Sequence, residues 1–222
     1  ERKTASTSIL CHNNFLDRKV LLITHATRNT TTGLDFENKV KIRGIMSINK
    51  GYLTAKTDKV SDEYYTPREA VIPILKYIDK GNKKQYTVWC PFDKEDSEYV
   101  KCIREEGHKV IFSHIDDGKN FFEYEPEEHY DCIISNPPFS LKDDVLKRLY
   151  ELETPYAILL PLPTLQGQKR FEYLKDCQAL IFDKRINFYS NEARTQMAKG
   201  VAFASIYICK DFLPNDLIFE KL

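Results

Sequence analysis

Residues 131–140 combine side chains that could hold and activate an amine. The apolar run 132–134 is typical of a buried strand, and Asn136, two prolines and Phe139 follow it. Because proline cannot donate to a sheet ladder, the strand must end there, and the chain beyond it should be stiff and extended. An Asn side-chain oxygen and a proline carbonyl can each accept one hydrogen from an exocyclic amine such as adenine N6. Directing the nitrogen lone pair at a methyl donor in this way requires positioning and electrostatics, and no metal.

Asn136, Pro137, Pro138 and Phe139 resemble the catalytic motif of adenine-specific DNA methyltransferases that use S-adenosylmethionine. The resemblance implies that Asn136 and Pro137 hold the amine of a base flipped out of the duplex, and that Phe139 stacks on it. A proline-rich turn after a core strand is the alternative interpretation of the same residues. Further matches in the expected order along the chain favour the catalytic interpretation.

A second match lies upstream, at Tyr65, Thr66 and Pro67. Thr66 can cap a helix that has Pro67 at its first position, so a well-capped helix is the simpler interpretation. The segment also resembles the Tyr-Thr-Pro element of adenine methyltransferases, which lines the methionine end of the cofactor. Its place before the cofactor-binding strand and the Asn136 motif matches the gamma-type order of these enzymes.

The strand predicted at 85–89 ends in a polar segment that contains Cys90 and Asp93. Methyltransferases of this kind normally have a glycine-rich loop here, yet the chain has no glycine between Gly81 and Gly107. EcoRI-type adenine methylases are similar in having a Cys-Pro-rich, Asp-containing strand end. That resemblance implies that Cys90 and Asp93 contact the cofactor, with Asp93 pairing with its α-ammonium group. An ordinary loop that caps the next helix is the alternative, and both interpretations can hold together.

A second strand is predicted at 109–115, and it completes a strand–helix–strand unit with a helix at 97–106. An acid at the end of this strand commonly binds ribose hydroxyls in nucleoside-binding folds, and Asp116 and Asp117 occupy that place. Phe121 resembles the aromatic residue that flanks the cofactor adenine in these enzymes. Solvated surface acids and ordinary core packing are the respective alternatives.

The remaining pattern predicts an α/β fold, a Rossmann-like methyltransferase domain with a mostly parallel sheet and helices on both faces. An amphipathic helix at 141–152 and strands at 156–163, 179–182 and 201–209 follow the motif. One strand near the C-terminus should be antiparallel. The C-terminal pattern is similar to that of phage-encoded adenine methylases, so the resemblance covers 58–212.

Composition and charge exclude a globally basic nucleic-acid binder, and the N-terminal composition suggests how the chain is divided. The 222 residues carry 33 acidic and 33 basic side chains, so the chain is no globally basic nucleic-acid binder, and any DNA contact must be local. Residues 1–45 are polar and aperiodic. We expect there either a leader or non-native extension, with Met46 as the native start, or an N-terminal arm, followed by a methyltransferase domain at 46–222.

The cysteines and the hydropathy pattern bear on the cellular compartment. The six cysteines show no disulfide or metal-binding spacing, and no apolar run is long enough to span a membrane. These features predict a cytoplasmic protein without a bound metal, and the resemblance to EcoRI-type and phage-encoded methylases implies a bacterial or phage-infected cell.

These expectations converge on an enzyme that methylates adenine N6 in DNA with S-adenosylmethionine. Little chain remains for a target-recognition domain, so sequence specificity would come from loops or from a partner protein. The biological role, whether in restriction-modification, in phage self-protection or in regulation, stays open. Two alternatives also stay open: an RNA-adenine or protein-glutamine methyltransferase, and a non-catalytic protein that keeps the fold and binds DNA or a partner. Basic residues that could face DNA are Lys169, Arg170, Lys184, Arg185, Arg194 and Lys199.

Overall fold

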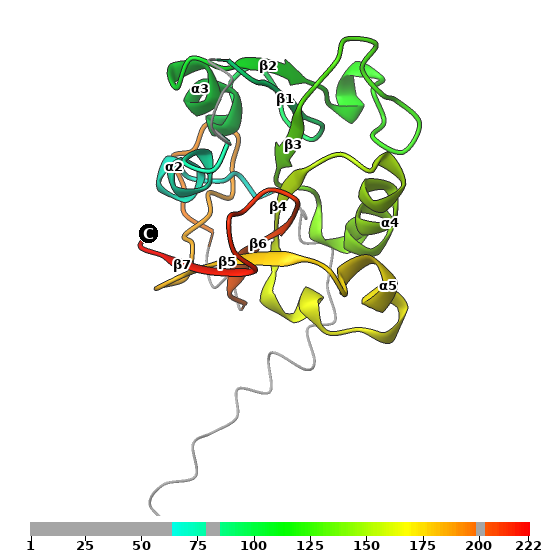
Figure 1. Ribbon diagram of the computed structural model, residues 1–222. Helices are drawn as coiled ribbons and strands as arrows, with labels where there is room; N and C mark the ends of the chain where they lie inside the picture. The colour runs from blue at the N-terminus through cyan, green and yellow to red at the C-terminus, as the bar shows by residue number, and fades with distance from the viewer. Residues whose placement is uncertain (1–63, 79–84, 199–202) are drawn as a thin grey trace, which may run out of the picture. The chain divides into compact units, whose positions relative to one another are not determined.

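The computed structural model describes residues 64–78, 85–198 and 203–222 (Figure 1). Every described residue belongs to the compact unit Lys50–Leu222. The expectations for residues 1–45 and for Met46 lie outside the described residues, and so does Lys199 among the basic residues that could face DNA.

A seven-stranded sheet forms the centre of this unit, in the order β2-β1-β3-β4-β6-β5-β7. The four strands β1 to β4 run parallel to one another, whereas β6 is antiparallel to both β4 and β5. The predicted antiparallel strand near the C-terminus is therefore confirmed as β6. The strands are β1 (Thr87–Cys90), β2 (Lys109–Phe112), β3 (Cys132–Ser135), β4 (Tyr156–Pro161), β5 (Gln178–Phe182), β6 (Ser205–Lys210) and β7 (Leu217–Glu220).

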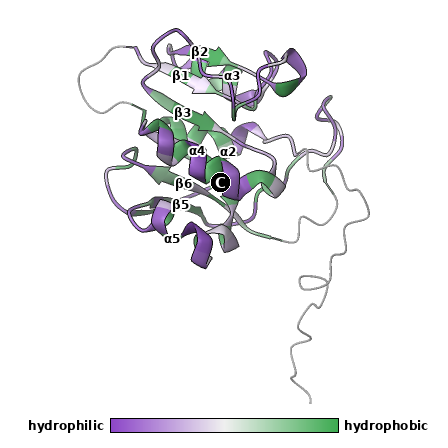
Figure 2. Cartoon of the chain, turned by 90° about the vertical axis from the view of Figure 1, so that its right-hand side faces the viewer, coloured by the Kyte–Doolittle hydropathy of each residue, from purple (hydrophilic) through white to green (hydrophobic). Residues whose placement is uncertain are grey.

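Helices cover both faces of the sheet. Figure 1 shows α2 and α3 on one side of the strands and α4 and α5 on the other. Hydrophobic residues concentrate on the strands, while hydrophilic residues lie on the outer surfaces of the helices and loops (Figure 2). The structure thus has the predicted Rossmann-like α/β fold. The helices are α2 (Arg68–Leu75), α3 (Glu98–Glu105), α4 (Lys142–Leu152) and α5 (Phe171–Leu174).

The middle of the sheet is buried on both faces, which explains the continuous apolar runs in the sequence. Ile133 and Ile134 of β3 are inaccessible to solvent, as are Leu159 and Leu160 of β4. These two neighbouring strands therefore form a rigid base for the segments that follow them. The strand order also reverses between β1 and β3, and in open α/β sheets ligands bind at the carboxyl ends of the strands at that point.

A buried pair of tyrosines ties the helices α2 and α3 to the sheet. The hydroxyl oxygens of Tyr99 and Tyr207 are 2.8 Å apart, and Tyr207 donates to the carbonyl of Ala70 at 3.0 Å. Burial raises the pKa of both phenols, so both stay protonated and can donate. This network fixes the start of α2, and with it the Tyr65-Thr66-Pro67 segment, relative to β6.

The structure corrects the predicted cap of α2. The helix begins at Arg68, and Pro67 takes the N-cap position, where its side chain makes no capping hydrogen bond. Thr66 is instead buried, with 6% of its surface exposed. The reason lies far along the chain: the backbone groups of Tyr65 and Tyr189 exchange two hydrogen bonds of 3.0 Å, which hold the segment extended. None of the helices in the described ranges is long and apolar enough to cross a membrane.

Candidate functional site

A pocket opens where β1, β2 and β3 end. Its cavity measures about 180 Å³ and opens to solvent. Ligand sites in open α/β sheets lie at this edge, so the cleft is the candidate binding site. The pocket is the cleft expected from the reversal in strand order, and its wall combines segments from widely separated parts of the chain.

Most of the predicted site residues meet in this pocket. The hydrogen bond from Asn136 to the Tyr64 carbonyl joins the upstream segment to the end of β3, and the loop after β1 lines the same pocket. The predicted residues that line the pocket are Tyr65, Thr66, Asp93, Phe121, Asn136, Pro137 and Pro138.

Other predicted residues lie outside the pocket lining. Pro67 is the N-cap of α2, and Cys90 is fully buried at the end of β1, where burial raises the pKa of its thiol. Asp116 and Asp117 belong to the 3₁₀ turn η1 (Ile115–Asp117) at the surface. Asp116 pairs with Lys94 at 3.0 Å, and this ammonium lowers the pKa of the carboxyl. Its neighbours His114 and Ile115 form the wall at the place expected for a ribose-binding acid.

Asn136 follows β3 and places its side-chain amide at the pocket. Its Nδ2 donates to the carbonyl of Tyr64 at 2.9 Å. Since a carbonyl can only accept, this contact fixes which end of the amide is nitrogen. Within the described part of the chain, the buried Oδ1 accepts no hydrogen bond. A buried polar atom without a partner costs roughly 1–3 kcal/mol, so a ligand donor that reached Oδ1 would bind favourably.

Phe139 lies in an aromatic cluster behind the pocket wall. Its ring stacks on Tyr64, with centroids 5.9 Å apart and planes inclined by 24°, and it meets the edges of Phe188 and Phe203. Only 7% of Phe139 is exposed. The stacking of Phe139 on a substrate base stays a prediction, and it requires the Tyr64 ring to move.

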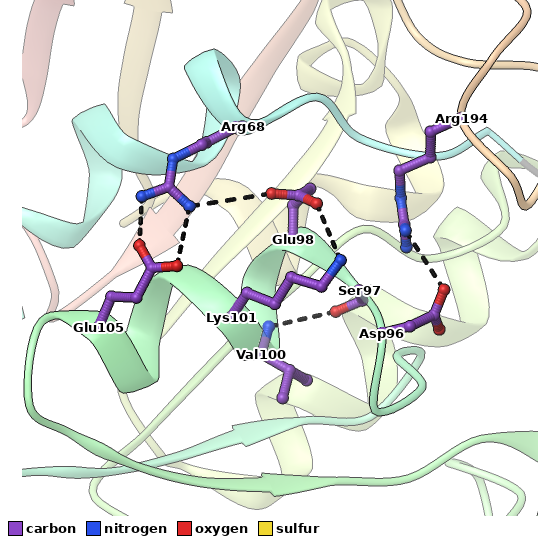
Figure 3. A network of polar contacts seen from close by, with 8 residues as sticks. All are labelled: Arg68, Asp96, Ser97, Glu98, Val100, Lys101, Glu105 and Arg194. Carbon is purple, nitrogen blue, oxygen red and sulfur yellow. Dashed lines mark hydrogen bonds and ion pairs between the residues drawn. The ribbon is translucent and has the colours of Figure 1, made fainter.

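Asp93 is the buried acid of the pocket, with 7% of its surface exposed. Burial raises its pKa to about 6, while hydrogen bonds from Ser135 and Ser97 and the nearby Arg194 guanidinium limit the rise. The capping role of the loop is confirmed, because Ser97 accepts from the backbone N–H of Val100 and caps α3 (Figure 3), while its cofactor role stays a prediction. Asp93 therefore offers a partially charged carboxylate to a cationic ligand group.

An apolar slot occupies the β2 side of the pocket. Phe92 and Phe121 pack with ring centroids 4.9 Å apart, and Ile115 projects beside the pocket with 65% of its surface exposed. Phe121 also packs on Trp89 at 5.5 Å, so it belongs to the core as well as to the pocket wall. A slot of this kind suits a flat apolar ring.

Arg194 is a pocket residue that we predicted only as one of several DNA-facing cations. Its guanidinium pairs with Asp96 at 3.2 Å (Figure 3) and lies 5.8 Å from the centre of the Tyr65 ring. A loop of polar residues carries it, and no periodicity in the sequence indicates where that loop folds back. Among the described residues, no group of three or more His, Cys, Asp or Glu side chains could hold a metal ion.

Comparisons with known proteins reveal distant structural likenesses. No protein-family model and no curated protein sequence matches the chain. The crystal structure of the 23S rRNA methyltransferase ErmE is 10% identical, covers 69% of this chain and 71% of that chain, and gives a TM-score of 0.39. A protein-(glutamine-N5) methyltransferase from Alicyclobacillus acidocaldarius is 10% identical over 65% of this chain and 92% of that chain, with a TM-score of 0.32. A precorrin-6y C5,15-methyltransferase from Geobacter metallireducens is 12% identical over 68% and 94%, respectively, with a TM-score of 0.32. The assignment of the fold rests on the strand order and layers described above.

Proposed function

We propose that this chain transfers a methyl group from S-adenosylmethionine to the N6 amine of adenine in DNA. The observation that supports the proposal most is the buried Asn136 Oδ1 at the end of β3, an acceptor without a hydrogen-bond partner among the described residues. Pro137 and Pro138 lie on the wall of the same pocket. An amine placed there would meet the acceptors that the motif was expected to provide.

The chain's own residues perform the positioning. Asn136 Oδ1 and the Pro137 carbonyl each accept one hydrogen of the amine, which favours a pyramidal nitrogen and directs its lone pair into the pocket. The Tyr64 carbonyl holds the Asn136 amide in orientation through Nδ2. S-adenosylmethionine, when bound, supplies the methyl group as an electrophile. Because these acceptors are held before the amine arrives, they need no reorganisation during the reaction.

The pocket suits the proposed cofactor at both ends. Phe92, Ile115 and Phe121 offer an apolar slot for a purine ring. At the other end, the buried Asp93 carboxylate suits an α-ammonium group. Ribose contacts from Asp116 or Asp117 stay a prediction, as does a cofactor contact from Cys90.

DNA is the proposed acceptor because the motif order Tyr65-Thr66-Pro67, strand, Asn136-Pro137-Pro138-Phe139 resembles that of adenine-specific DNA methyltransferases. The basic residues proposed to face DNA include Arg170, which pairs with Asp143 at 2.5 Å, and Arg194, which pairs with Asp96. We further propose that loops or a partner protein select the target sequence.

Transfer of tritiated methyl groups tests the proposal. Wild-type protein should label DNA in preference to pools of RNA and protein. Asn136→Ala should reduce labelling by about a hundredfold or more, the usual loss when one preorganised polar group of an active site is removed. The matched control is Asn215→Ala, which changes an exposed asparagine outside the pocket lining and should keep full activity. Undiminished DNA labelling by Asn136→Ala, or labelling of RNA or protein alone, would overturn the proposal.

A further inference from the structure

Arg194 stands at the tip of a hydrogen-bonded hairpin, residues 188–198. Ala198 N donates to Phe188 O at 2.8 Å, and Ser190 N donates to Gln196 O at 2.9 Å. At the tip, Asn191 Oδ1 accepts from the backbone of Thr195 and Gln196 at 3.1 and 2.9 Å. The hairpin is therefore a built element that fixes where Arg194 begins.

The backbone of Arg194 adopts a conformation that a long side chain rarely takes. Its φ is +53°, in the left-handed region that glycine and asparagine occupy most readily. Such a conformation is strained for a non-glycine residue, and residues of this kind cluster at ligand sites. Arginine therefore occupies a position whose backbone conformation favours glycine or asparagine.

The side chain of Arg194 is mostly buried but only partly satisfied. Its exposed fraction is 16%, with Asp96 paired to one nitrogen and the Tyr65 ring beneath the guanidinium. Within the described ranges, the buried Nε has no hydrogen-bond partner. A guanidinium offers five N–H donors, so donors remain for an anionic ligand group in the pocket.

The two lysines of the pocket lining contact other side chains. Lys94 bridges Asp116 and Glu192 at 3.0 and 3.3 Å, and Lys119 lies 5.4 Å from the centre of the Tyr124 ring. Arg194, in contrast, has a buried donor, Nε, without a partner among the residues that the structure describes. It also lies close enough to the buried Asp93 to favour its charged form.

We propose that Arg194 binds the α-carboxylate of the cofactor's amino-acid end, while Asp93 binds its α-ammonium group. This inference rests on the proposed function, because it takes S-adenosylmethionine as the cofactor. A zwitterion needs one cationic and one anionic group side by side, and this part of the pocket provides both. The pair does with side chains what a glycine-rich loop after β1 does with backbone groups, and this chain has no glycine between Gly81 and Gly107.

Calorimetric titration with two ligands tests the inference on the full chain. The ligands are S-adenosylmethionine and its decarboxylated form, which keeps the sulfonium, the amine and the nucleoside. Arg194→Asn removes the guanidinium and suits the left-handed backbone, so the hairpin should keep its fold. Arg104→Gln is the matched control, since Arg104 pairs with Glu95 on the surface and is not part of the pocket lining.

Arg194→Asn should weaken the binding of S-adenosylmethionine by about 10- to 100-fold, the change expected for losing hydrogen bonds to a charged group. The variant and the wild type should bind the decarboxylated ligand with affinities within about twofold of each other, because this ligand has no carboxylate for Arg194 to bind. Arg194→Lys should lie between, because an ammonium keeps the charge and loses the planar fork. Arg104→Gln should change neither affinity.

Equal losses for both ligands, or no loss for either, would overturn the role of Arg194 and leave the proposed function standing. Selective loss without methyl transfer to any acceptor would support Arg194 and overturn the proposed function. A wild-type chain that binds neither ligand, with or without DNA, would overturn the cofactor and with it this inference. Circular dichroism and thermal unfolding of each variant show whether it keeps the fold.

Discussion

Ser135 donates a hydrogen bond of 2.5 Å to Asp93 Oδ2, across the ends of two neighbouring strands. Ser135 is the last residue of β3 and directly precedes Asn136, whereas Asp93 follows β1. Both side chains are buried. The acid proposed for the cofactor and the amide proposed for the acceptor are thus held by one pair of parallel strands, so a change at either residue should be felt at the other.

Asp93→Asn should stabilise the protein at neutral pH while weakening cofactor binding. Asp93 has a folded-state pKa of about 6 against an ordinary value of 3.8, so the folded protein holds this proton more tightly than the unfolded chain does. Stability is therefore lost as pH rises between these two values. This difference in pKa corresponds to about 3 kcal/mol of unfolding free energy, which the wild type loses at neutral pH and the asparagine variant keeps.

Urea unfolding at a series of pH values checks this sign. The stability advantage of Asp93→Asn should be full above about pH 6 and should shrink toward zero near the ordinary pKa of 3.8. Titration with S-adenosylmethionine should show weaker binding by the same variant. A variant less stable than wild type at pH 7.5, or one that binds the cofactor equally well, would contradict the role given to Asp93.

The affinity for S-adenosylmethionine should rise with pH through about 6, because Asp93 must be ionised to pair with an ammonium group. Ser135→Ala removes a hydrogen bond that favours the carboxylate. The midpoint of the titration should then move to higher pH. Binding measured between pH 5 and 8 checks the shift, and Asp93→Asn should flatten the profile; an unmoved midpoint in Ser135→Ala would count against the coupling.

The sequence predicted the parts of the molecule that depend on local pattern. Buried strands such as β3 and β4 follow from apolar runs, and the stop at Pro137 follows from the missing amide hydrogen. The edge strand β7 escaped prediction because four residues are too few to show a periodicity, and its place depends on pairing with the distant strand β5.

Parts of the site that depend on distant contacts were harder to predict. Thr66 was expected to cap α2, but the Tyr65 bridge to Tyr189 holds the segment extended, and the Thr66 hydroxyl is buried. His114 reaches the pocket wall where Asp116 was expected, because η1 begins one residue after it. The pocket role of Arg194 depends on a hairpin whose fold-back leaves no periodic signal.

Tyr207→Phe should destabilise the protein more than Tyr99→Phe. The Tyr207 hydroxyl is bonded to two buried groups, the Ala70 carbonyl and the Tyr99 hydroxyl, so its removal leaves both without that partner. We expect a loss of about 1–3 kcal/mol for Tyr207→Phe and about 1 kcal/mol for Tyr99→Phe, whose loss spares the bond to Ala70. Urea unfolding of the two variants measures the order, and a reversed order would refute this account of the network.

The last prediction concerns the ring of Tyr64, which covers Phe139. Tyr64 stacks on Phe139, and its carbonyl accepts from Asn136, so the residue touches both groups proposed to hold the acceptor base. Tyr64→Ala keeps that carbonyl and removes the ring. The loss of an aromatic pair costs about 0.5–1.5 kcal/mol of stability beyond the lost buried area.

If the acceptor base stacks on Phe139, the Tyr64 ring competes with it, and Tyr64→Ala should lower the KM for a DNA oligonucleotide. Phe139→Ala should instead lose both activity and about 3–5 kcal/mol of stability, since a buried phenylalanine leaves a cavity. Tyr150→Ala is the control, because its half-exposed ring pairs with Tyr173 and is not part of the pocket lining. A KM that rises in Tyr64→Ala would show that Tyr64 is part of the acceptor site and that the base does not displace it.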